Sequence, residues 1–246
     1  MNNIGVGIFC FGEDFYYRGT VEKLKYLIGE GFHCYILTDN PDFFRKQYPA
    51  NILHTIEYQK NYHSYHDKMI LPKHVLKYHD YCVLIDADIH ITDYSFMTKL
   101  LKYQIKYGIS YVDTLMNHPA KKGLVKELLT DNIEWDPYKN YAEKLVPSFG
   151  EFETIWEYLL IINKIGFNQK KFYDYYDRLQ VAKDFCDLTL GKQVSGAGEG
   201  VSIAIASKLS GTDLQRDMEL YGDVKDTIKS VSRRFTRPEF WPDWMR

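Results

Sequence analysis

Short apolar segments alternate with amphipathic ones through much of this sequence, and this alternation is what most limits its possible folds. Residues 3–11 form a β-branched and aromatic run closed by Gly12, and residues 17–28 then repeat apolar side chains at helical spacing. Strand-like segments are residues 3–11, 32–37, 52–56, 81–85, 107–112 and 158–162, and helical segments are residues 17–28, 72–77, 96–105, 124–129, 172–186 and 199–209. The pattern predicts an α/β fold, a central and mostly parallel sheet with helices on both faces. Because ligands bind beyond the carboxyl ends of such strands, the residues that follow each strand are the functional candidates.

The length of 246 residues suits one large domain or two small ones. Residues 131–150 are polar and contain prolines, as in a domain boundary or a long insertion. We predict an insertion near the ligand site, because residues 158–162 resume the pattern of buried strands. The expected organisation is one domain over residues 1–246, divided into a first half (1–115), a second half (116–210) and a C-terminal tail (211–246).

The charge and the cysteine content indicate which partners and which cellular compartment to expect. Lys plus Arg number 31 and Asp plus Glu 33, so the net charge of -2 does not attract polyanions and any phosphate must meet a local patch. The four cysteines include no C-x-x-C pair, and Cys10, Cys34 and Cys82 lie in apolar runs. No apolar run approaches the roughly 20 residues of a membrane helix, and residues 1–3 lack the basic start of a signal peptide. We therefore expect a cytoplasmic protein without a transmembrane segment.

Two carboxylates follow the predicted strand 81–85. Asp86 and Asp88 are two residues apart, so their side chains project to the same side if the chain stays extended. Such hard oxygen ligands favour Mg²⁺ or Mn²⁺, which complete their shells with water and substrate phosphates. The alternative is that both aspartates only cap a turn, since Asp is common after strands. The tripeptide by itself does not decide between these interpretations.

The surroundings of this tripeptide resemble those of the GT-A fold glycosyltransferases. The shared features are a first strand that ends in a small polar loop, a second that ends in Leu-Thr-Asp (37–39), and Leu-Ile-Asp-Ala-Asp (84–88) after a third. The nearest members are the retaining family 6 enzymes, the blood-group and α-galactosyltransferase type. The resemblance implies that Asp86 and Asp88 hold Mn²⁺ or Mg²⁺ on the diphosphate of a UDP-sugar. All 8 histidines lie at or before His118, so no late histidine is expected to join them.

The resemblance also places the donor on the ends of the first strands, where the segment Phe9, Cys10 and Phe11 would hold the uridine. Polar residues near other strand ends are further donor candidates: Asp39 for the base, Asp113 for the sugar, Asp67 for a ribose or sugar hydroxyl, and Lys68 for a phosphate. Each also has an ordinary structural interpretation. Asp39 and Asp113 suit turns, whereas Asp67 suits a helix cap beside a solvated Lys68.

Two glutamates are the catalytic candidates. Glu199 follows a glycine-rich run and begins a predicted helix, and the resemblance implies that it faces the anomeric carbon as stabiliser, nucleophile or base. The helix dipole favours a carboxylate at that position for purely structural reasons as well. Glu157 precedes the strand 158–162 and is either a group for the acceptor hydroxyl or an exposed charge at a strand end.

The C-terminal segment is locally basic. Its arginines Arg233, Arg234 and Arg237 are predicted to bind the diphosphate and to neutralise the leaving group, with this tail closing over the donor. The same cluster also fits a solvated face, or contact with a nucleic-acid backbone through interleaved aromatic residues.

These features together predict a metal-dependent glycosyltransferase that moves a hexose from a UDP-sugar to a hydroxyl of a glycan or lipid-linked sugar. Residues 1–115 would bind the donor, 116–210 would bind the acceptor and catalyse, and 211–246 would close the site. The Tyr-, Lys-, Asn- and Ile-rich composition suits an AT-rich bacterial or phage genome, so hydroxymethylated DNA is a second candidate acceptor. Two rival functions are a nucleotidyltransferase and a non-catalytic sugar- or nucleic-acid-binding domain. A nucleotidyltransferase usually has a glycine-rich loop with basic residues after the first strand, whereas residues 13–14 after Gly12 are acidic here.

Overall fold

The computed structural model describes residues 3–58, 64–99, 107–111, 142–144, 155, 159–181, 197–216 and 228–230. The strands are β1 Ile4–Cys10, β2 His33–Thr38, β3 Leu53–Glu57, β4 Tyr81–Asp86, β5 Ile89–Ile91, β6 Ile109–Tyr111, β7 Leu159–Asn163, β8 Leu214–Arg216 and β9 Ile228–Ser230. The helices are α1 Asp14–Gly29, α2 Pro41–Arg45, the 3-10 helix η1 Ser64–Met69, α3 Ile70–Val75, α4 Ser95–Lys99, α7 Gln169–Val181 and α9 Ala197–Ser210.

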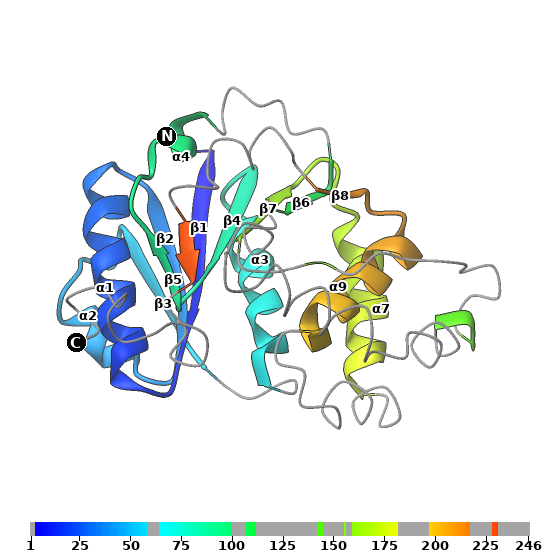
Figure 1. Ribbon diagram of the computed structural model, residues 1–246, viewed down its shortest axis with the longest axis horizontal. Helices are drawn as coiled ribbons and strands as arrows, with labels where there is room; N and C mark the ends of the chain where they lie inside the picture. Colours follow the sequence, from blue (N-terminus) through cyan, green and yellow to red (C-terminus); the bar gives the residue numbers. More distant parts are fainter. Residues whose placement is uncertain are drawn as a thin grey trace.

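The α/β prediction is confirmed. A seven-stranded sheet has the order β3-β2-β1-β4-β7-β6-β8, and β5 pairs with β9 in a small second sheet (Figure 1). The pairs β1–β2, β1–β4, β2–β3 and β6–β8 are parallel, whereas β7 runs antiparallel to both of its neighbours, β4 and β6. The sheet is therefore mostly parallel, and the carboxyl ends of β1, β2 and β4 meet at one edge.

Helices cover both faces of this sheet, as predicted. Figure 1 shows α1 and α2 on one side and α3, α7 and α9 on the other. Strand β1 is buried on both sides, and its glycines allow close packing on the α3 side. A Cβ on Gly7 would lie 2.7 Å from Leu84 Cδ2 and 3.2 Å from Leu71 Cβ, so a larger residue would push this layer apart.

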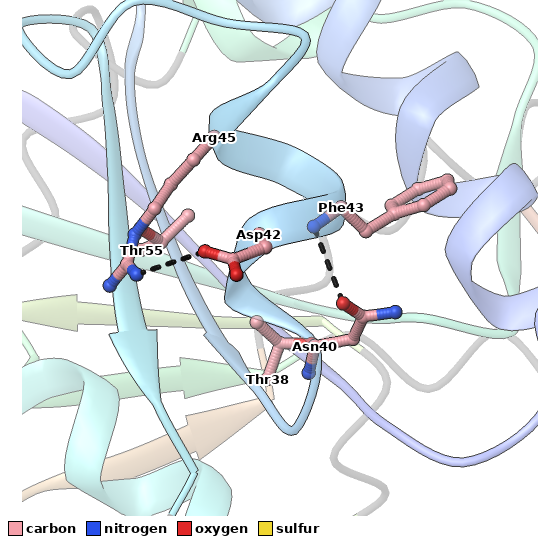
Figure 2. A network of polar contacts seen from close by, with 6 residues as sticks. All are labelled: Thr38, Asn40, Asp42, Phe43, Arg45 and Thr55. Atoms are coloured by element: carbon pink, nitrogen blue, oxygen red, sulfur yellow. Dashed lines mark hydrogen bonds and ion pairs between the residues drawn. The ribbon is translucent and has the colours of Figure 1, made fainter.

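The turn after β2 leads into the short helix α2. Figure 2 shows the side chain of Asn40 capping this helix, with Oδ1 accepting a hydrogen bond from the Phe43 amide at 3.3 Å. Arg45 holds the other end, because its Nε donates to Thr55 Oγ1 at 2.8 Å and its Nη1 lies 3.4 Å from Asp42 Oδ1. The chain bends at Asp39 between β2 and α2, which agrees with the interpretation of Asp39 as a turn residue. The helix that follows it was not predicted, and neither were β5, β8 and β9.

Several expectations fall outside the described residues. They include the helix at 124–129, the insertion at 131–150 and the ends of the helices predicted at 96–105 and 172–186. Among the residues that the structure does describe, Cys10, Cys34 and Cys82 are buried free thiols, as their apolar surroundings predicted. None of the described helices combines the length and the hydropathy that crossing a membrane requires.

Candidate functional site

Sheet register brings the first predicted site residues together. Phe9 pairs with Asp86 across β1 and β4, and Cys10 pairs with Thr38 across β1 and β2. Asp39 follows Thr38 directly, so its turn lies next to the end of β1. The ends of three strands that are far apart in the sequence therefore form one continuous edge.

Lys68 is a buried cation on Asp86. Its Nζ lies 2.9 Å from Asp86 Oδ1, and its side chain is 4% exposed whereas that of Asp86 is 21% exposed. Helix α7 holds the segment that carries Lys68, because the Tyr173 hydroxyl donates to the Met69 carbonyl at 2.8 Å and the Tyr176 hydroxyl to the His66 carbonyl at 3.0 Å. The interpretation of Lys68 as a solvated side chain is thus wrong. It is an ammonium group held in place beside the first aspartate of the pair.

The donor set at this edge fits a hard divalent cation. Oδ1 of Asp86 accepts a hydrogen bond from Lys68 Nζ, whereas Oδ2 of that carboxylate forms no hydrogen bond to the described residues. Burial, and then repulsion from Asp86, raise the pKa of the half-buried Asp88, against the opposing effect of Lys23 and Lys68. In the described part of the chain no cluster of three or more His, Cys, Asp or Glu side chains could hold a metal. Two carboxylates, phosphate oxygens and water are a suitable ligand set for Mg²⁺ or Mn²⁺.

A second buried lysine, which the sequence analysis did not single out, contacts the same turn. Lys23 is 3% exposed, and its Nζ donates to the carbonyl of Ala87 at 2.7 Å. Burial lowers the pKa of Lys23 to about 8, while the negative groups around it, Asp88 and Asp86 among them, act in the opposite direction. One signal was present in the sequence: Lys23 occupies the same helical stripe as the buried residues Thr20, Leu24 and Leu27, where a charge is unusual.

Three aromatic rings form a cluster beside Asp86, which we call the aromatic platform: Phe9, Phe11 and Tyr58. Ring centroids are 4.7 Å apart for Phe9 and Phe11, 5.4 Å for Phe9 and Tyr58, and 5.5 Å for Phe11 and Tyr58. Burial and a hydrogen bond to the fully buried Asp67 raise the pKa of Tyr58 to about 12, so its hydroxyl stays protonated. Tyr58 was not among the predicted donor residues, although it is an aromatic residue directly after a strand.

Cys10, between the two phenylalanines, faces the other side of the sheet. It is fully buried in the core that includes Leu24 and Leu27 of α1, whereas Phe9 belongs to the core on the opposite face. Burial raises the pKa of the Cys10 thiol to about 12. Its side chain therefore packs against α1 and does not join the aromatic platform.

Asp39 connects the two loops at the end of the sheet. Its Oδ1 accepts a hydrogen bond from the Tyr17 hydroxyl at 2.6 Å, and its Oδ2 accepts one from the Gly12 amide at 3.2 Å. Gly12 has φ of 93°, a conformation that favours glycine, so this loop is shaped to bring its amide to the carboxylate. Asp39 is exposed at this edge, where a ligand can also reach it.

Helix α9 carries the predicted catalytic residue Glu199. The helix spans Ala197–Ser210, so Glu199 lies in its first turn, as the sequence indicated. α9 packs against α7 and against η1, which carries Lys68. The side chain of Glu199 lies outside the described residues, as do Glu157, Asp113, Arg233, Arg234 and Arg237. Their roles stay predictions.

Comparisons with known proteins give similarities of fold only. No protein-family model and no curated protein matches the sequence. The chain is similar to mouse xyloside xylosyltransferase 1 in its apo form, at 7% identity over 96% of this chain and 100% of that one, with a TM-score of 0.48. It is similar to the galactosyltransferase LgtC in complex with donor and acceptor sugar analogs, at 11% identity over 93% and 85% of the two chains, with a TM-score of 0.47.

The chain is also similar to 4-diphosphocytidyl-2C-methyl-D-erythritol synthase from Anaerococcus prevotii, at 9% identity over 92% of this chain and 97% of that one, with a TM-score of 0.41. Fold does not select among reactions, so the function has to be argued from the residues of the site.

Proposed function

We propose that this protein is a metal-dependent glycosyltransferase that moves a hexose from a UDP-sugar to an acceptor hydroxyl. The observation that carries the proposal is the edge formed by β1 and β4, where the Asp86-Ala87-Asp88 turn, the buried Lys68 and the aromatic platform lie side by side. A nucleotide sugar combines a flat base with a charged diphosphate. An aromatic surface next to a cation-binding carboxylate pair offers one partner to each.

The aromatic platform is suited to the base. Phe9 is buried beneath the half-buried rings of Phe11 and Tyr58, which are the ones a base would stack on. Stacking of a base on an aromatic side chain contributes about 1–3 kcal/mol in nucleic-acid complexes. Asp39 lies at the neighbouring strand end and can accept a hydrogen bond from the base or ribose. Cys10 contributes only its backbone to this arrangement, because its thiol is in the core.

The carboxylate pair is suited to the diphosphate. Asp86 and Asp88 would hold Mn²⁺ or Mg²⁺, which when bound neutralises charge on the leaving nucleoside diphosphate. Lys68 orients Asp86 through Oδ1, and its ammonium is a second positive charge for a phosphate oxygen. The neighbouring Asp67 is fully buried and forms a hydrogen bond with the half-buried Tyr58, which limits the freedom of this segment.

The remaining predicted residues complete the proposal. Glu199 would face the anomeric carbon and Glu157 the acceptor hydroxyl, with Asp113 on the sugar. Arg233, Arg234 and Arg237 would bind the diphosphate. The family 6 placement, the choice of UDP and the glycan or lipid-linked acceptor belong to the same proposal, and hydroxymethylated DNA is the second acceptor to be tested.

The experiment is release of nucleoside diphosphate from a panel of nucleotide sugars with Mn²⁺, followed by acceptor screening by mass spectrometry. We expect slow release from one UDP-hexose, and its loss in D86N and in D88N. The matched control is D80N, which makes the same substitution at an exposed position just before the other end of β4. D80N should keep wild-type activity.

Three results would contradict the proposal or redirect it. Absence of release and of metal-dependent UDP binding rejects the glycosyltransferase. Pyrophosphate release from a nucleoside triphosphate and a sugar phosphate indicates a nucleotidyltransferase instead. Sugar binding that survives in the D86N/D88N double variant, without turnover in the wild type, indicates a binding domain. Among acceptors, a mass increase on a hydroxymethylcytosine duplex and not on oligosaccharides would select DNA.

A further inference from the structure

Lys23 is a buried charge whose position ordinary packing does not explain. It lies on the core-facing stripe of α1, yet its Nζ reaches the carbonyl of Ala87 at 2.7 Å, with a weaker contact to its own helix at Gly19 O, 3.4 Å away. Burying an ammonium is costly unless it is paired, so a site that needed only volume would favour an unbranched apolar residue. Its partner is the carbonyl of Ala87, the residue between the two aspartates of the proposed metal site.

The two lysines act on this turn from opposite faces of the sheet. Lys68 comes from the face of α3 and α7 and binds the side chain of Asp86. Lys23 comes from the face of α1 and binds the backbone of Ala87, whose side chain packs in the α1 core. The Lys68 contact fixes the position of the Asp86 carboxylate, and the Lys23 contact fixes the main chain from which both carboxylates project.

Helix α1, which carries Lys23, is itself held against the sheet at more than one point. Six residues before Lys23, or about 9 Å along the helix axis, Tyr17 donates its hydroxyl to Asp39 at 2.6 Å. The same helix therefore binds the strand end at Asp39 and the turn after β4. Its residues Leu24 and Leu27, between Lys23 and the C-terminal end of the helix, are buried in the core on this face of the sheet.

We infer that Lys23 is a positioning residue for the divalent cation, holding the Ala87 carbonyl so that Asp86 and Asp88 keep the separation that the cation requires. This inference rests on the proposed function, because it assumes a cation on the two aspartates. Lys23 itself contacts neither the cation nor the donor. Its effect passes through the backbone, and partners of metal ligands contribute about 10–100-fold to metal affinity.

The test is direct titration of Mn²⁺, counted as free ion by electron paramagnetic resonance, into wild type and Lys23→Met, each with and without UDP. Met follows a similar path through the core and lacks the ammonium. We expect about a 10-fold weaker Mn²⁺ affinity in K23M, with UDP binding in EDTA unchanged. Lys23→Arg keeps a buried cation with N–H donors and should recover part of the affinity.

The matched control for a purely structural role is Leu27→Val, one turn further along the same buried stripe of α1. It is expected to lower the melting temperature of the metal-free protein without changing Mn²⁺ affinity. If K23M is insoluble, Lys23→Gln tests the same loss of charge.

The outcomes separate the two proposals. Wild-type protein that binds no Mn²⁺, with or without UDP, overturns the proposed function and this inference with it. Wild type that binds Mn²⁺, together with a folded K23M that binds it equally well, overturns the positioning role alone and leaves Lys23 as a structural residue.

Discussion

The ion pair between Lys68 and Asp86 offers the sharpest test of the site's energetics. Removal of one partner of a buried pair leaves an uncompensated charge and costs about 3–5 kcal/mol. The side chain of Asp86 is 21% exposed, so part of its charge stays hydrated in the Lys68→Met variant. We therefore expect K68M to lower the free energy of unfolding by about 2–3 kcal/mol. At about 2–4 °C per kcal/mol for a domain of this size, the melting temperature falls by about 4–12 °C.

A double-mutant cycle separates the pair from the other contacts of Lys68. D86N removes the carboxylate that lies beside the buried ammonium and should also destabilise, whereas K68M/D86N removes both charges. The double variant should be more stable than the sum of the single changes by about 2 kcal/mol. The assay is urea unfolding followed by circular dichroism in EDTA, because a bound cation would add its own stabilisation. A coupling energy below about 0.5 kcal/mol would refute the argument that these two charges depend on each other.

Three further predictions concern the scaffold. Gly7→Ala should destabilise by about 1–3 kcal/mol in thermal unfolding, because its Cβ would lie 2.7 Å from Leu84 Cδ2, whereas Gly29→Ala, with open space around it, should not. Burial and the neighbouring His33 and His79 lower the pKa of His54, so its contribution to stability should fall as pH drops through the unfolded value of about 6.5 towards the lower folded value. Melting temperatures from about pH 7.5 to about pH 5.5 should therefore fall more steeply in wild type than in His54→Gln, and equal slopes would contradict this. Burial also raises the pKa of Cys10 to about 12, so iodoacetamide at about pH 8 should leave it unmodified in the native protein, and rapid labelling seen by peptide mass mapping would show that α1 opens.

The order of strands and helices was predictable from local pattern. β1, β2, β3, β4 and β7 each coincide with a run of β-branched or aromatic residues, and α1 and α9 with apolar spacing near the helical period. The elements α2, β5 and β8 were not predicted, because no sustained apolar run or helical repeat marks them in the sequence. α2 depends on its Asn40 cap and Pro41 more than on a repeating pattern.

In the candidate site, too, some residues could be identified from the sequence and others could not. Asp86 and Asp88 could be identified from the sequence because an acidic pair at the end of a buried strand is a local signal. Lys23 and Tyr58 could not be assigned, because their partners are 64 residues away for Lys23 and in a different element for Tyr58. The sequence places Lys23 on an apolar stripe and Tyr58 directly after a strand, but it does not identify the partner that each residue contacts.

What the sequence by itself determined, then, is the order of the main strands and helices, the mostly parallel sheet and the acidic turn after β4. Tertiary structure decided that β7 runs antiparallel, that Cys10 turns into the α1 core while Phe9 and Phe11 join Tyr58, and that two buried ammonium groups reach one turn from opposite faces. The physical reason is that periodicity reports which side of an element is buried, whereas the partner of a buried charge depends on which elements the fold stacks against it. A lysine on an apolar stripe indicates that a partner exists, and the fold alone supplies the carbonyl of Ala87.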